Sequence, residues 1–405
     1  MINIRSLSIK TVIGVLSFSL TLVFLFKTIG HVEDYSVLLV DLGNVLIGIC
    51  GILLVILSRK TYINKLMVWF LLYLLLNIII CKPPSIFSPY LRLLYMCYVL
   101  LVISPIIQND NFRKLRENSF LYMCVFSVII SLVSFIFYFL GINFFNGDEE
   151  IFAEYLSHGG WFAGLTKHSM LLGPVSGIAS VSMFAMFLKT KKYIYLVIFL
   201  LCLSSVLFSA SRGALYSVIV SIFVMMFRAS KSISVFFRRF AFLFTLSFFL
   251  FAFSDTLLSG IKHKYEVRDV DQEGLFASRQ VRMEHRMDEF LENPFFGIGF
   301  ASLDLKYEEE YSSTTGGVEP GTSWLAILSM TGLCGFFLVF LIFFYAFKHS
   351  YIESTIESTA KIGVLSMFVV HMLIEGYFYA AGSPLFFMVW LTLGTSVDNK
   401  YKIRA

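Results

Sequence analysis

A series of long apolar runs constrains the fold of this chain more than any other feature. Runs of roughly 15 to 22 residues are long enough to cross a bilayer as helices. Hydrophobic residues fill 58% of the 405 positions and charged residues only 15%, a balance that excludes an ordinary soluble globular domain. We therefore predict an all-α polytopic membrane protein with about twelve transmembrane helices, near 11–28, 36–57, 66–81, 93–107, 120–140, 170–188, 194–210, 215–227, 240–258, 323–347, 362–379 and 382–397.

The distribution of Lys and Arg predicts how the helices are oriented. With the N-terminus inside, every predicted inner loop carries basic residues, whereas the short outer loops carry few. The formal net charge of +5 follows from this bias and gives no argument for nucleic-acid binding. The chain then divides into helices one to nine (1–258, with the outer loop 141–169), a large outer loop with short amphipathic helices (259–322), and helices ten to twelve with an inner tail (323–405).

No residue pattern in the sequence indicates a metal or a cofactor. The cysteines fall in or at the ends of predicted spans, so we interpret them as small apolar residues and not as disulfide partners. No cluster of His, Cys, Asp and Glu has metal-ligand spacing, and there is no phosphate-binding loop. We therefore predict that the protein uses neither a metal nor a cofactor.

The stretch Ser209-Ala-Ser-Arg-Gly213 places Arg212 between two apolar runs. A guanidinium stays charged at any accessible pH and is costly in lipid, so such an arginine usually lines a polar cavity or binds an anion. Ser209 and Ser211 offer hydroxyl donors, and Gly213 would allow close approach of a ligand. The alternative is an arginine at a helix end that extends toward the membrane surface.

The large outer loop contains a predicted helix from Ser278 to Leu291. Arg279, Arg282 and Arg286 lie on one side of this helix, beside an apolar stripe, as in a helix that lies on a membrane surface. We interpret these arginines as further anion-binding groups, with a lipid-headgroup or salt-bridge stripe as the alternative. The glycine-punctuated segment 295–300 that follows is predicted to pack back onto the bundle.

Three further places carry candidate site residues. Glu319, just before the tenth span, could orient or deprotonate an acceptor hydroxyl, with Thr322 beside it; the alternative is a helix start capped by Thr322 or the serine after it. His371 and Glu375 are spaced i, i+4 and are predicted to share one face of the eleventh span, as site residues or as a mutually satisfied pair. His168, at the outer start of the sixth span, is a candidate for the same cavity or an interfacial residue.

Together these motifs resemble the O-antigen ligase and polymerase superfamily of bacterial envelope glycosyltransferases. From Thr166 to Gly335 they run as Ser-x-Ser-Arg-Gly, then Arg279 ahead of Asn-Pro-Phe-Phe-Gly-Ile-Gly, then Ser-Trp-Leu-x(5)-Thr-Gly-Leu-x-Gly. The resemblance implies a metal-independent, inverting transfer of glycan from undecaprenyl diphosphate on the periplasmic face of the inner membrane. It implies that Arg212 and Arg279 hold the diphosphate and stabilise the negative charge that develops as it leaves.

One departure from the family pattern favours the polymerase branch. The ligases that this chain resembles carry a His-Asn pair just before the tenth span, where this sequence has Gly321-Thr322, and no histidine lies between Arg286 and Phe347. We therefore expect a polymerase that extends lipid-linked repeat units, with Glu319 as the candidate that activates the acceptor. A ligase that uses another base, and a structural envelope protein, stay open as alternatives.

A flippase or other transporter for lipid-linked glycan is the alternative from a different functional class. The concentration of polar residues in one outer loop, and the lack of evident sequence halves, speak against it. The expected partners are an undecaprenyl-diphosphate-linked oligosaccharide, membrane lipid and a chain-length regulator, with no nucleic acid. The residues expected to bind substrate are Ser211, Arg282, Arg286, His168, Thr322, His371 and Glu375.

Overall fold

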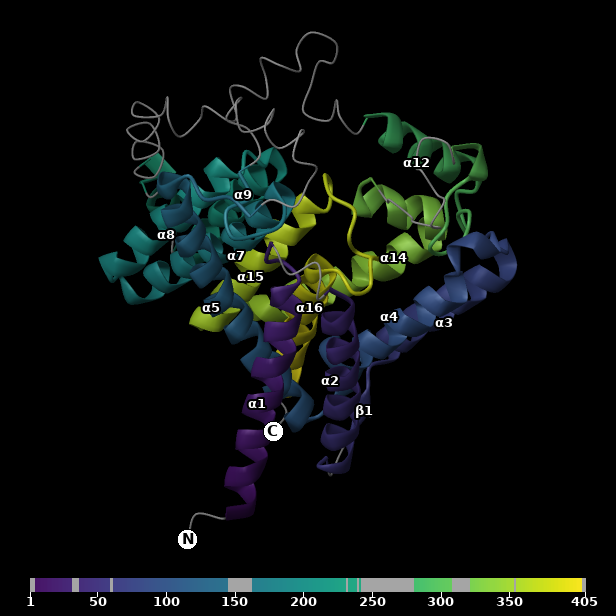
Figure 1. Cartoon of the computed structure of the whole chain (residues 1–405), viewed down its shortest axis with the longest axis horizontal. Helices are drawn as coiled ribbons and strands as arrows, with labels where there is room; N and C mark the ends of the chain where they lie inside the picture. The colour runs from purple at the N-terminus through teal and green to yellow at the C-terminus, as the bar shows by residue number, and fades with distance from the viewer. Residues whose placement is uncertain are drawn as a thin grey trace.

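The structure is a computed structural model, and it describes residues 4–30, 36–58, 61–144, 162–230, 232–238, 240–241, 280–307, 321–352 and 355–402. Helices dominate these ranges, and six of them are long and apolar enough to cross a membrane, with four shorter apolar helices beside them. Helices α8 and α9 lie on one side of the molecule and α12 and α14 on the other, with α15 and α16 between them (Figure 1). The chain is an all-α polytopic membrane protein.

Eleven of the twelve predicted spans fall on observed helices, and the remaining one, 240–258, lies outside the described residues from position 242 on. The other elements are a short helix, α12 (Gln280–Glu292), two 3-10 turns, η2 (Ser85–Phe87) and η4 (Leu305–Tyr307), and an antiparallel pair, β1 (Tyr62–Ile63) with β2 (Ile107–Gln108). Residues 233–238 are also helical. The spans are α1 (Ile4–Phe26), α2 (Ser36–Ile56), α3 (Lys65–Cys81), α4 (Pro89–Ile103), α5 (Asp110–Leu140), α7 (Ser169–Thr190), α8 (Tyr193–Phe208), α9 (Arg212–Ala229), α14 (Ser323–Ile352), α15 (Ile356–His371) and α16 (Pro384–Lys402).

Helix α5 begins ten residues earlier than its apolar run predicts. Its first turns contain Arg116, which is fully buried although the charge pattern places this stretch in an inner loop. The guanidinium donates to both carboxylate oxygens of Asp398 on α16, at 2.7 and 2.8 Å, and to the carbonyl oxygen of Ser104 at 2.9 Å. Charge pairing with a residue far along the chain thus allows a polar sequence to continue a buried helix.

Helix α15 ends at His371, so the predicted span 362–379 is wrong at its outer end. Residues 372–383 are mostly apolar, apart from Glu375 and Ser383, but they form a non-helical connection to α16. The carbonyl oxygens of Met372 and Glu375 both accept from the backbone N–H of Ser323, each at 3.0 Å. Hydrogen bonds to another element therefore replace helical bonds in this connection, which we call the 372–383 segment.

Helix α14 is broken at Gly332, whose φ of 62° is non-helical. The glycine-punctuated segment after α12 fills the break: the N–H of Ile298 donates to Ser329 O, and the N–H of Leu333 donates to Pro294 O, both at 2.8 Å. These bonds satisfy backbone groups that the break would leave unpaired inside the bundle. The prediction that this segment packs back onto the bundle is confirmed.

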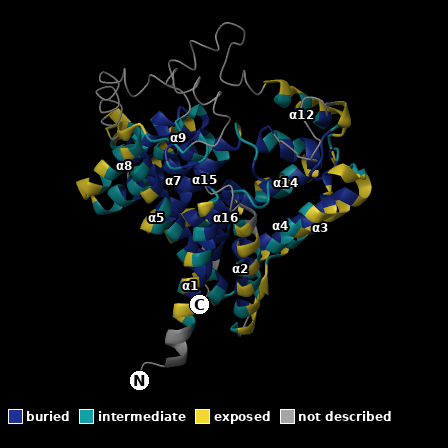
Figure 2. Cartoon of the chain, viewed as in Figure 1, coloured by how far each residue is buried: buried dark blue, intermediate teal, exposed yellow. Residues whose placement is uncertain are grey.

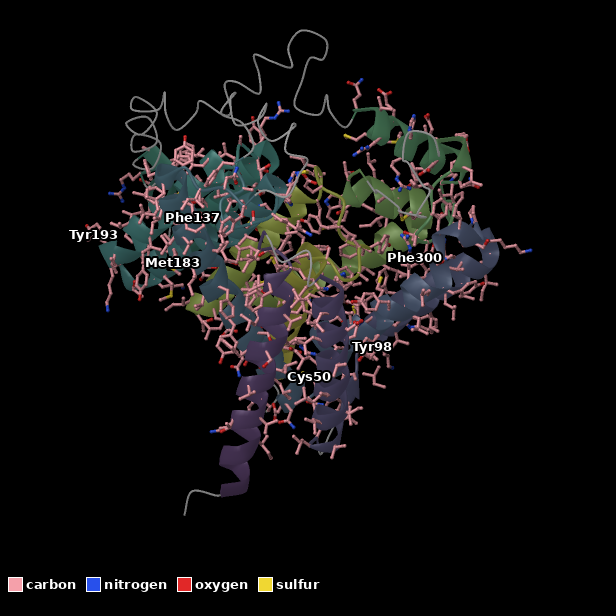
Figure 3. The ribbon with its side chains drawn as sticks, viewed as in Figure 1. Cys50, Tyr98, Phe137, Met183, Tyr193 and Phe300 are labelled. Atoms are coloured by element: carbon pink, nitrogen blue, oxygen red, sulfur yellow. The ribbon has the colours of Figure 1, made fainter. Side chains whose placement is uncertain are left out.

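Burial separates the centre of the bundle from its lipid-facing rim. Helices α7, α15 and α16 are mostly buried, whereas α2 and α3 carry many exposed residues (Figure 2). Small residues such as Gly173 and Gly177 line buried positions on α7, where they permit close helix packing. All six cysteines are free thiols, and Cys50 on α2 points into the core (Figure 3). Cys50, Cys124 and Cys202 are buried, as expected of packing residues, whereas Cys334 is exposed.

Contacts between distant segments define two ends of the bundle. We name them the outer and inner ends, after the predicted orientation. At the inner end, Nη2 of Arg228, in the last turn of α9, donates to the carbonyl oxygen of Ser350 at 3.1 Å. At the outer end, the N–H of Lys167 donates to Thr28 O at 2.9 Å, and Ser323 meets the 372–383 segment. The outer end holds residues 27–30, 162–168, 209–213, 321–323 and 372–383.

Candidate functional site at the outer end of the bundle

The Ser209–Gly213 stretch forms the turn between α8 and α9. The hydroxyl of Ser209 donates to Val206 O at 2.7 Å and accepts from the backbone N–H of Ser211 at 3.3 Å, while Ala210 takes a left-handed conformation with φ 48°. This turn makes Arg212 the first residue of α9, and its side chain is half-buried. The predicted position of the arginine at a helix end is confirmed.

The start of α9 concentrates positive potential. Ser211 is the N-cap, with its hydroxyl oxygen accepting from Ala214 N at 3.5 Å, and the first turn holds no acidic residue. A helix N-terminus carries about half a positive charge, so a cation there is unfavourable unless an anion is nearby. The backbone N–H groups and the Arg212 guanidinium therefore favour the same kind of ligand.

Two neighbours frame the Arg212 turn. A Cβ placed on Gly213 would lie 3.1 Å from the side chain of Ile374, so this glycine fits the 372–383 segment against α9. A Cβ on Gly173 of α7 would lie 2.7 Å from the Cβ of Ser211. Gly213 thus faces protein, in contrast to the expectation that it would open toward a ligand, and α7 and the 372–383 segment form two walls beside Arg212.

The 372–383 segment joins this turn to the start of α14. The hydroxyl of Ser323 donates to Glu375 O at 2.6 Å and accepts from the N–H of Tyr377 at 3.0 Å. The prediction that His371 and Glu375 share a helical face is wrong, because α15 ends at His371. His371 is fully buried, with Nδ1 3.1 Å from the hydroxyl of Tyr377, whereas Glu375 is half-buried in the connection.

The residues around Thr322 complete the start of α14. Thr322 is buried and caps the helix, since its hydroxyl oxygen accepts from Leu325 N at 3.3 Å. Gly321 has φ 67°, and a Cβ there would lie 3.3 Å from the Cβ of Arg282, which places α12 beside this cap. The indole N–H of Trp324 donates to Val369 O at 2.9 Å, so this tryptophan lies between α14 and α15.

Arg286 fixes α12 onto α14. It is 1% exposed and donates through Nη1 to Glu289 at 2.9 Å and to the Ser329 hydroxyl at 3.1 Å. Its Nε and Nη2 atoms make no hydrogen bond within the described residues. The buried face of α12 is therefore this ion pair, and not the apolar stripe expected of a helix that lies on a membrane surface.

His168 lies at the start of α7, where Nδ1 of its imidazole accepts from the N–H of Met170 at 3.0 Å. An accepting Nδ1 places the ring proton on Nε2 in the neutral form. Because Gly173 contacts Ser211, His168 lies little more than one turn of α7 from the Arg212 turn. Arg279 and Glu319, which precede α12 and α14 in the sequence, lie outside the described residues.

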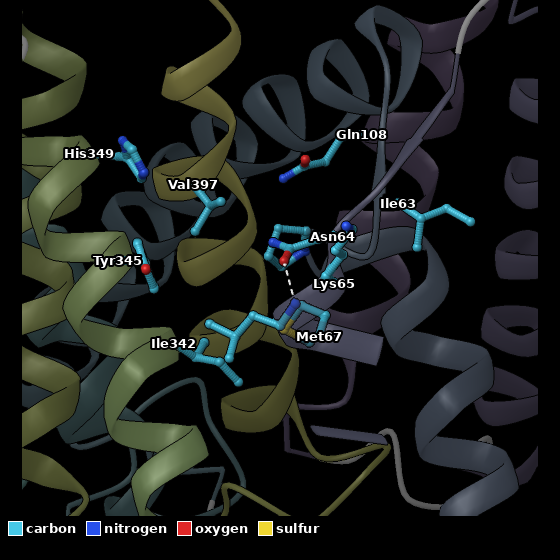
Figure 4. A pocket seen from close by; sticks show the side chains of 11 residues that line it. Ile63, Asn64, Lys65, Met67, Gln108, Ile342, Tyr345, His349 and Val397 are labelled. Atoms are coloured by element: carbon cyan, nitrogen blue, oxygen red, sulfur yellow. Dashed lines mark hydrogen bonds between the residues drawn. The ribbon is translucent and has the colours of Figure 1, made fainter. Parts of the chain in front are cut away.

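The structure thus brings Ser211, Arg212, Thr322, Arg282 and Glu375 to one end of the bundle through a chain of contacts. No three His, Cys, Asp or Glu side chains in the described part of the chain are grouped to hold a metal ion. A cavity of about 310 Å³ lies near the C-terminal end of α14, away from these residues. Its lining includes Lys65, Gln108, Tyr345 and His349 (Figure 4). None of the predicted site residues lines that inner-end cavity.

One outer-end residue escaped the sequence reasoning. Lys27 follows α1, and its Nζ donates to the carbonyl oxygen of Gly382 in the 372–383 segment at 3.1 Å. The sequence did hold one signal for Lys27. Basic residues are expected mainly in inner loops, so a lysine at the outer end of a span is unusual.

Comparisons with known proteins bear on these residues. No curated protein matches the chain. A family model described as O-antigen ligase matches residues 196–340, from α8 to within α14, and this stretch contains Arg212, Arg282 and Thr322. The family acts on lipid-linked oligosaccharides. The match supports the place of this chain in the O-antigen ligase and polymerase superfamily of membrane glycosyltransferase-like enzymes.

Proposed function

We propose that this chain is a polysaccharide polymerase. It moves a growing glycan from undecaprenyl diphosphate onto a sugar of a second lipid-linked repeat unit, at the periplasmic face of the bacterial inner membrane. The observation that carries the proposal is the position of Arg212: a half-buried guanidinium at the acid-free start of α9. Both features favour a compact anion with several oxygen acceptors, and a diphosphate has this chemistry.

The proposed reaction is a single displacement at the anomeric carbon. The acceptor hydroxyl attacks from the face opposite the diphosphate, so a new C–O bond forms while the bond to the diphosphate breaks and the configuration inverts. The electron pair of the broken bond stays on the diphosphate oxygen, where Arg212 and Arg279 stabilise it. The hydroxyl proton passes to the Glu319 carboxylate.

Other predicted residues have supporting roles in this proposal. Arg282 contacts the diphosphate and Glu375 contacts the glycan, whereas Thr322, which is buried and caps α14, holds the start of that helix in place. Arg286 and His371 are buried in bonds to protein groups, so they hold α12 and the end of α15 in place. The absence of a histidine before α14 favours a sugar acceptor over the lipid A-core acceptor of the ligases.

Substitution of Arg212 in cells tests the proposal. We expect Arg212→Ala to abolish long polysaccharide while single repeat units are still made and attached, and Arg212→Lys to restore part of the chain length. Arg238→Ala is the matched control, because Arg238 is exposed near the inner end. Normal chain length in the Arg212→Ala strain, at equal protein level, would overturn the proposal.

The family description makes an O-antigen ligase the second candidate. A ligase predicts a different product in a deletion strain: lipid-linked polymer accumulates unattached, because polymerisation proceeds without attachment. A polymerase predicts single repeat units on the final acceptor. Gel separation of the lipid-linked and lipopolysaccharide fractions from the deletion strain distinguishes the two.

A further inference from the structure

The inner-end cavity lies where three parts of the fold meet. The β1–β2 pair and the start of α3 form one wall, the last turns of α14 form another, and Val397 of α16 completes the lining (Figure 4). Its volume of about 310 Å³ is within the range of small-ligand pockets. Apolar side chains make up about half of the lining, and the polar members are Asn64, Lys65, Gln108, Tyr345 and His349.

The side chain of Gln108 indicates that this cavity takes a polar ligand. Gln108 is only 3% exposed, and its amide extends from β2 toward Val397 (Figure 4). The amide makes no hydrogen bond to any residue that the structure describes. Burial of an amide without a partner is unfavourable, because the group loses its hydrogen bonds to water. A ligand that bonds to the amide from within the cavity removes that cost.

The start of α3 gives the cavity a positive potential. The side chain of Asn64 accepts from Leu66 N at 3.1 Å, which leaves other N–H groups of the first turn without a helical acceptor. Lys65 is the first residue of the helix, and the first turn holds no acid. The described lining contains no Asp or Glu, and the Asp398 carboxylate on α16 is paired with Arg116 at 2.7 Å. The cavity therefore favours an anion.

The two helices that flank the cavity border lipid. Both carry exposed apolar side chains, Trp69 and Leu72 on α3 and Phe340 and Phe344 on α14. Exposed apolar faces of membrane-spanning helices contact acyl chains, and the ends of such helices lie at the level of the headgroups. The cavity lies at the N-terminal end of one of these helices and at the C-terminal end of the other. A phospholipid can therefore reach it from the side.

We propose that the inner-end cavity binds the phosphate of an anionic membrane phospholipid. The ammonium group of Lys65 and the amide N–H groups of Gln108 donate to the phosphate oxygens at the positive start of α3. Tyr345 and His349, whose stacked rings have centres 6.3 Å apart, form the opposite wall. A zwitterionic lipid binds less well, because its own ammonium group lies beside Lys65. The site does not depend on the proposed polymerase chemistry, since Arg212 lies at the other end of the bundle.

The first test measures lipid binding by the purified full-length protein in neutral detergent. Native mass spectrometry follows the tightest bound lipid during titration with phosphatidylglycerol or phosphatidylcholine. We expect the wild type to prefer phosphatidylglycerol, and Lys65→Gln to weaken its binding about tenfold, as expected for loss of a charge-assisted hydrogen bond.

Lys348→Gln is the matched control. It removes the same charge from an exposed residue of α14 that does not line the cavity, so phosphatidylglycerol should bind this variant as it binds the wild type. Equal affinity of the wild type and Lys65→Gln for phosphatidylglycerol, or an equal loss in both lysine variants, would overturn the site.

Gln108→Leu separates a ligand-binding amide from a structural one. Without lipid, this variant should unfold at the wild-type temperature or above it, because leucine replaces an amide that bonds to no described residue. Added phosphatidylglycerol should raise the unfolding temperature of the wild type more than that of the variant, since a ligand stabilises the folded protein in proportion to its affinity. An equal rise in the two proteins would overturn the role of Gln108.

A soluble phosphate compound is the other source of the same chemistry, and competition distinguishes the two. The compound sn-glycerol 3-phosphate carries the phosphate without the acyl chains. At the concentration at which phosphatidylglycerol saturates the wild type, it should leave the lipid bound, because only the lipid also contacts the apolar wall and the exposed faces of α3 and α14. Displacement of the lipid at that concentration would overturn the assignment to a membrane phospholipid.

Discussion

The side-chain oxygen of Ser323 lies 2.6 Å from the carbonyl oxygen of Glu375, so the first residue of α14 is tied to the segment that follows α15. The same hydroxyl accepts from the backbone N–H of Tyr377 at 3.0 Å. Because Ile374 of this segment contacts Gly213, one serine positions the start of α14 with respect to the Arg212 turn.

Ser323→Ala should therefore lower both stability and activity. Removing the hydroxyl leaves buried backbone groups without partners, which costs about 2 kcal/mol. Thermal unfolding of the purified protein measures this loss. Ser204→Ala is the matched control, because the Ser204 hydroxyl only bonds back to Leu200 O within α8 at 3.0 Å. Equal unfolding midpoints for the two variants would contradict the role given to Ser323.

Gly332→Ala should be strongly destabilising. An added Cβ would lie 2.3 Å from the backbone of Phe295, at a φ of 62° that disfavours side chains, so the segment that fills the α14 break must move. We expect a loss of about 3 kcal/mol. Gly14→Ala in α1 is the control, since a Cβ there meets nothing within 4 Å. If denaturant titration finds both variants equally stable, the break in α14 is not as described.

Breaking the ion pair between Arg116 and Asp398 should cost more stability than replacing both residues with apolar ones. Asp398→Asn leaves a buried guanidinium without its counter-charge, at a cost of about 3 kcal/mol, whereas Arg116→Met/Asp398→Leu should be less destabilised than the single variant. The exposed pair Lys306–Glu292 is the control, and Glu292→Gln should cost less than about 1 kcal/mol. A double variant less stable than Asp398→Asn would contradict this account.

Glu319 and Glu375 have different proposed roles, and kinetics separates them. Glu319→Gln should lower kcat at least about 100-fold with little change in KM, as expected for loss of a general base. Glu375→Gln should mainly raise KM, as expected for a binding residue. If Glu375→Gln abolishes turnover and Glu319→Gln does not, the proton acceptor has been assigned to the wrong carboxylate.

Hydropathy and charge predicted most of the bundle, because the main requirement for a helix in lipid is an apolar run long enough to cross the bilayer. The errors occur where long-range pairing overrides this rule. Arg116 extends α5 into polar sequence because Asp398 neutralises it. Residues 372–379 are mostly apolar but leave the helix because Ser323 binds their backbone. Neither partner can be identified from local sequence.

The candidate site was predicted in part. Arg212 and Thr322 stand where their local motifs place them, at the starts of α9 and α14. Arg286 has the same helical spacing as the other loop arginines, but it is buried because it forms an ion pair with Glu289, one turn away. Lys27 was missed because its hydrogen-bond partner, the carbonyl oxygen of Gly382, lies far along the chain and only the fold brings it near.

The most direct test of the central claim is bond formation by the purified protein. Full-length chain in nanodiscs, incubated with lipid-linked repeat units alone, should make products longer than one repeat and release undecaprenyl diphosphate; Arg212→Ala should make none, and Arg238→Ala should match the wild type. A wild-type protein that forms no glycosidic bond, as expected of a transporter, or an Arg212→Ala protein that polymerises at the wild-type rate, would contradict the account.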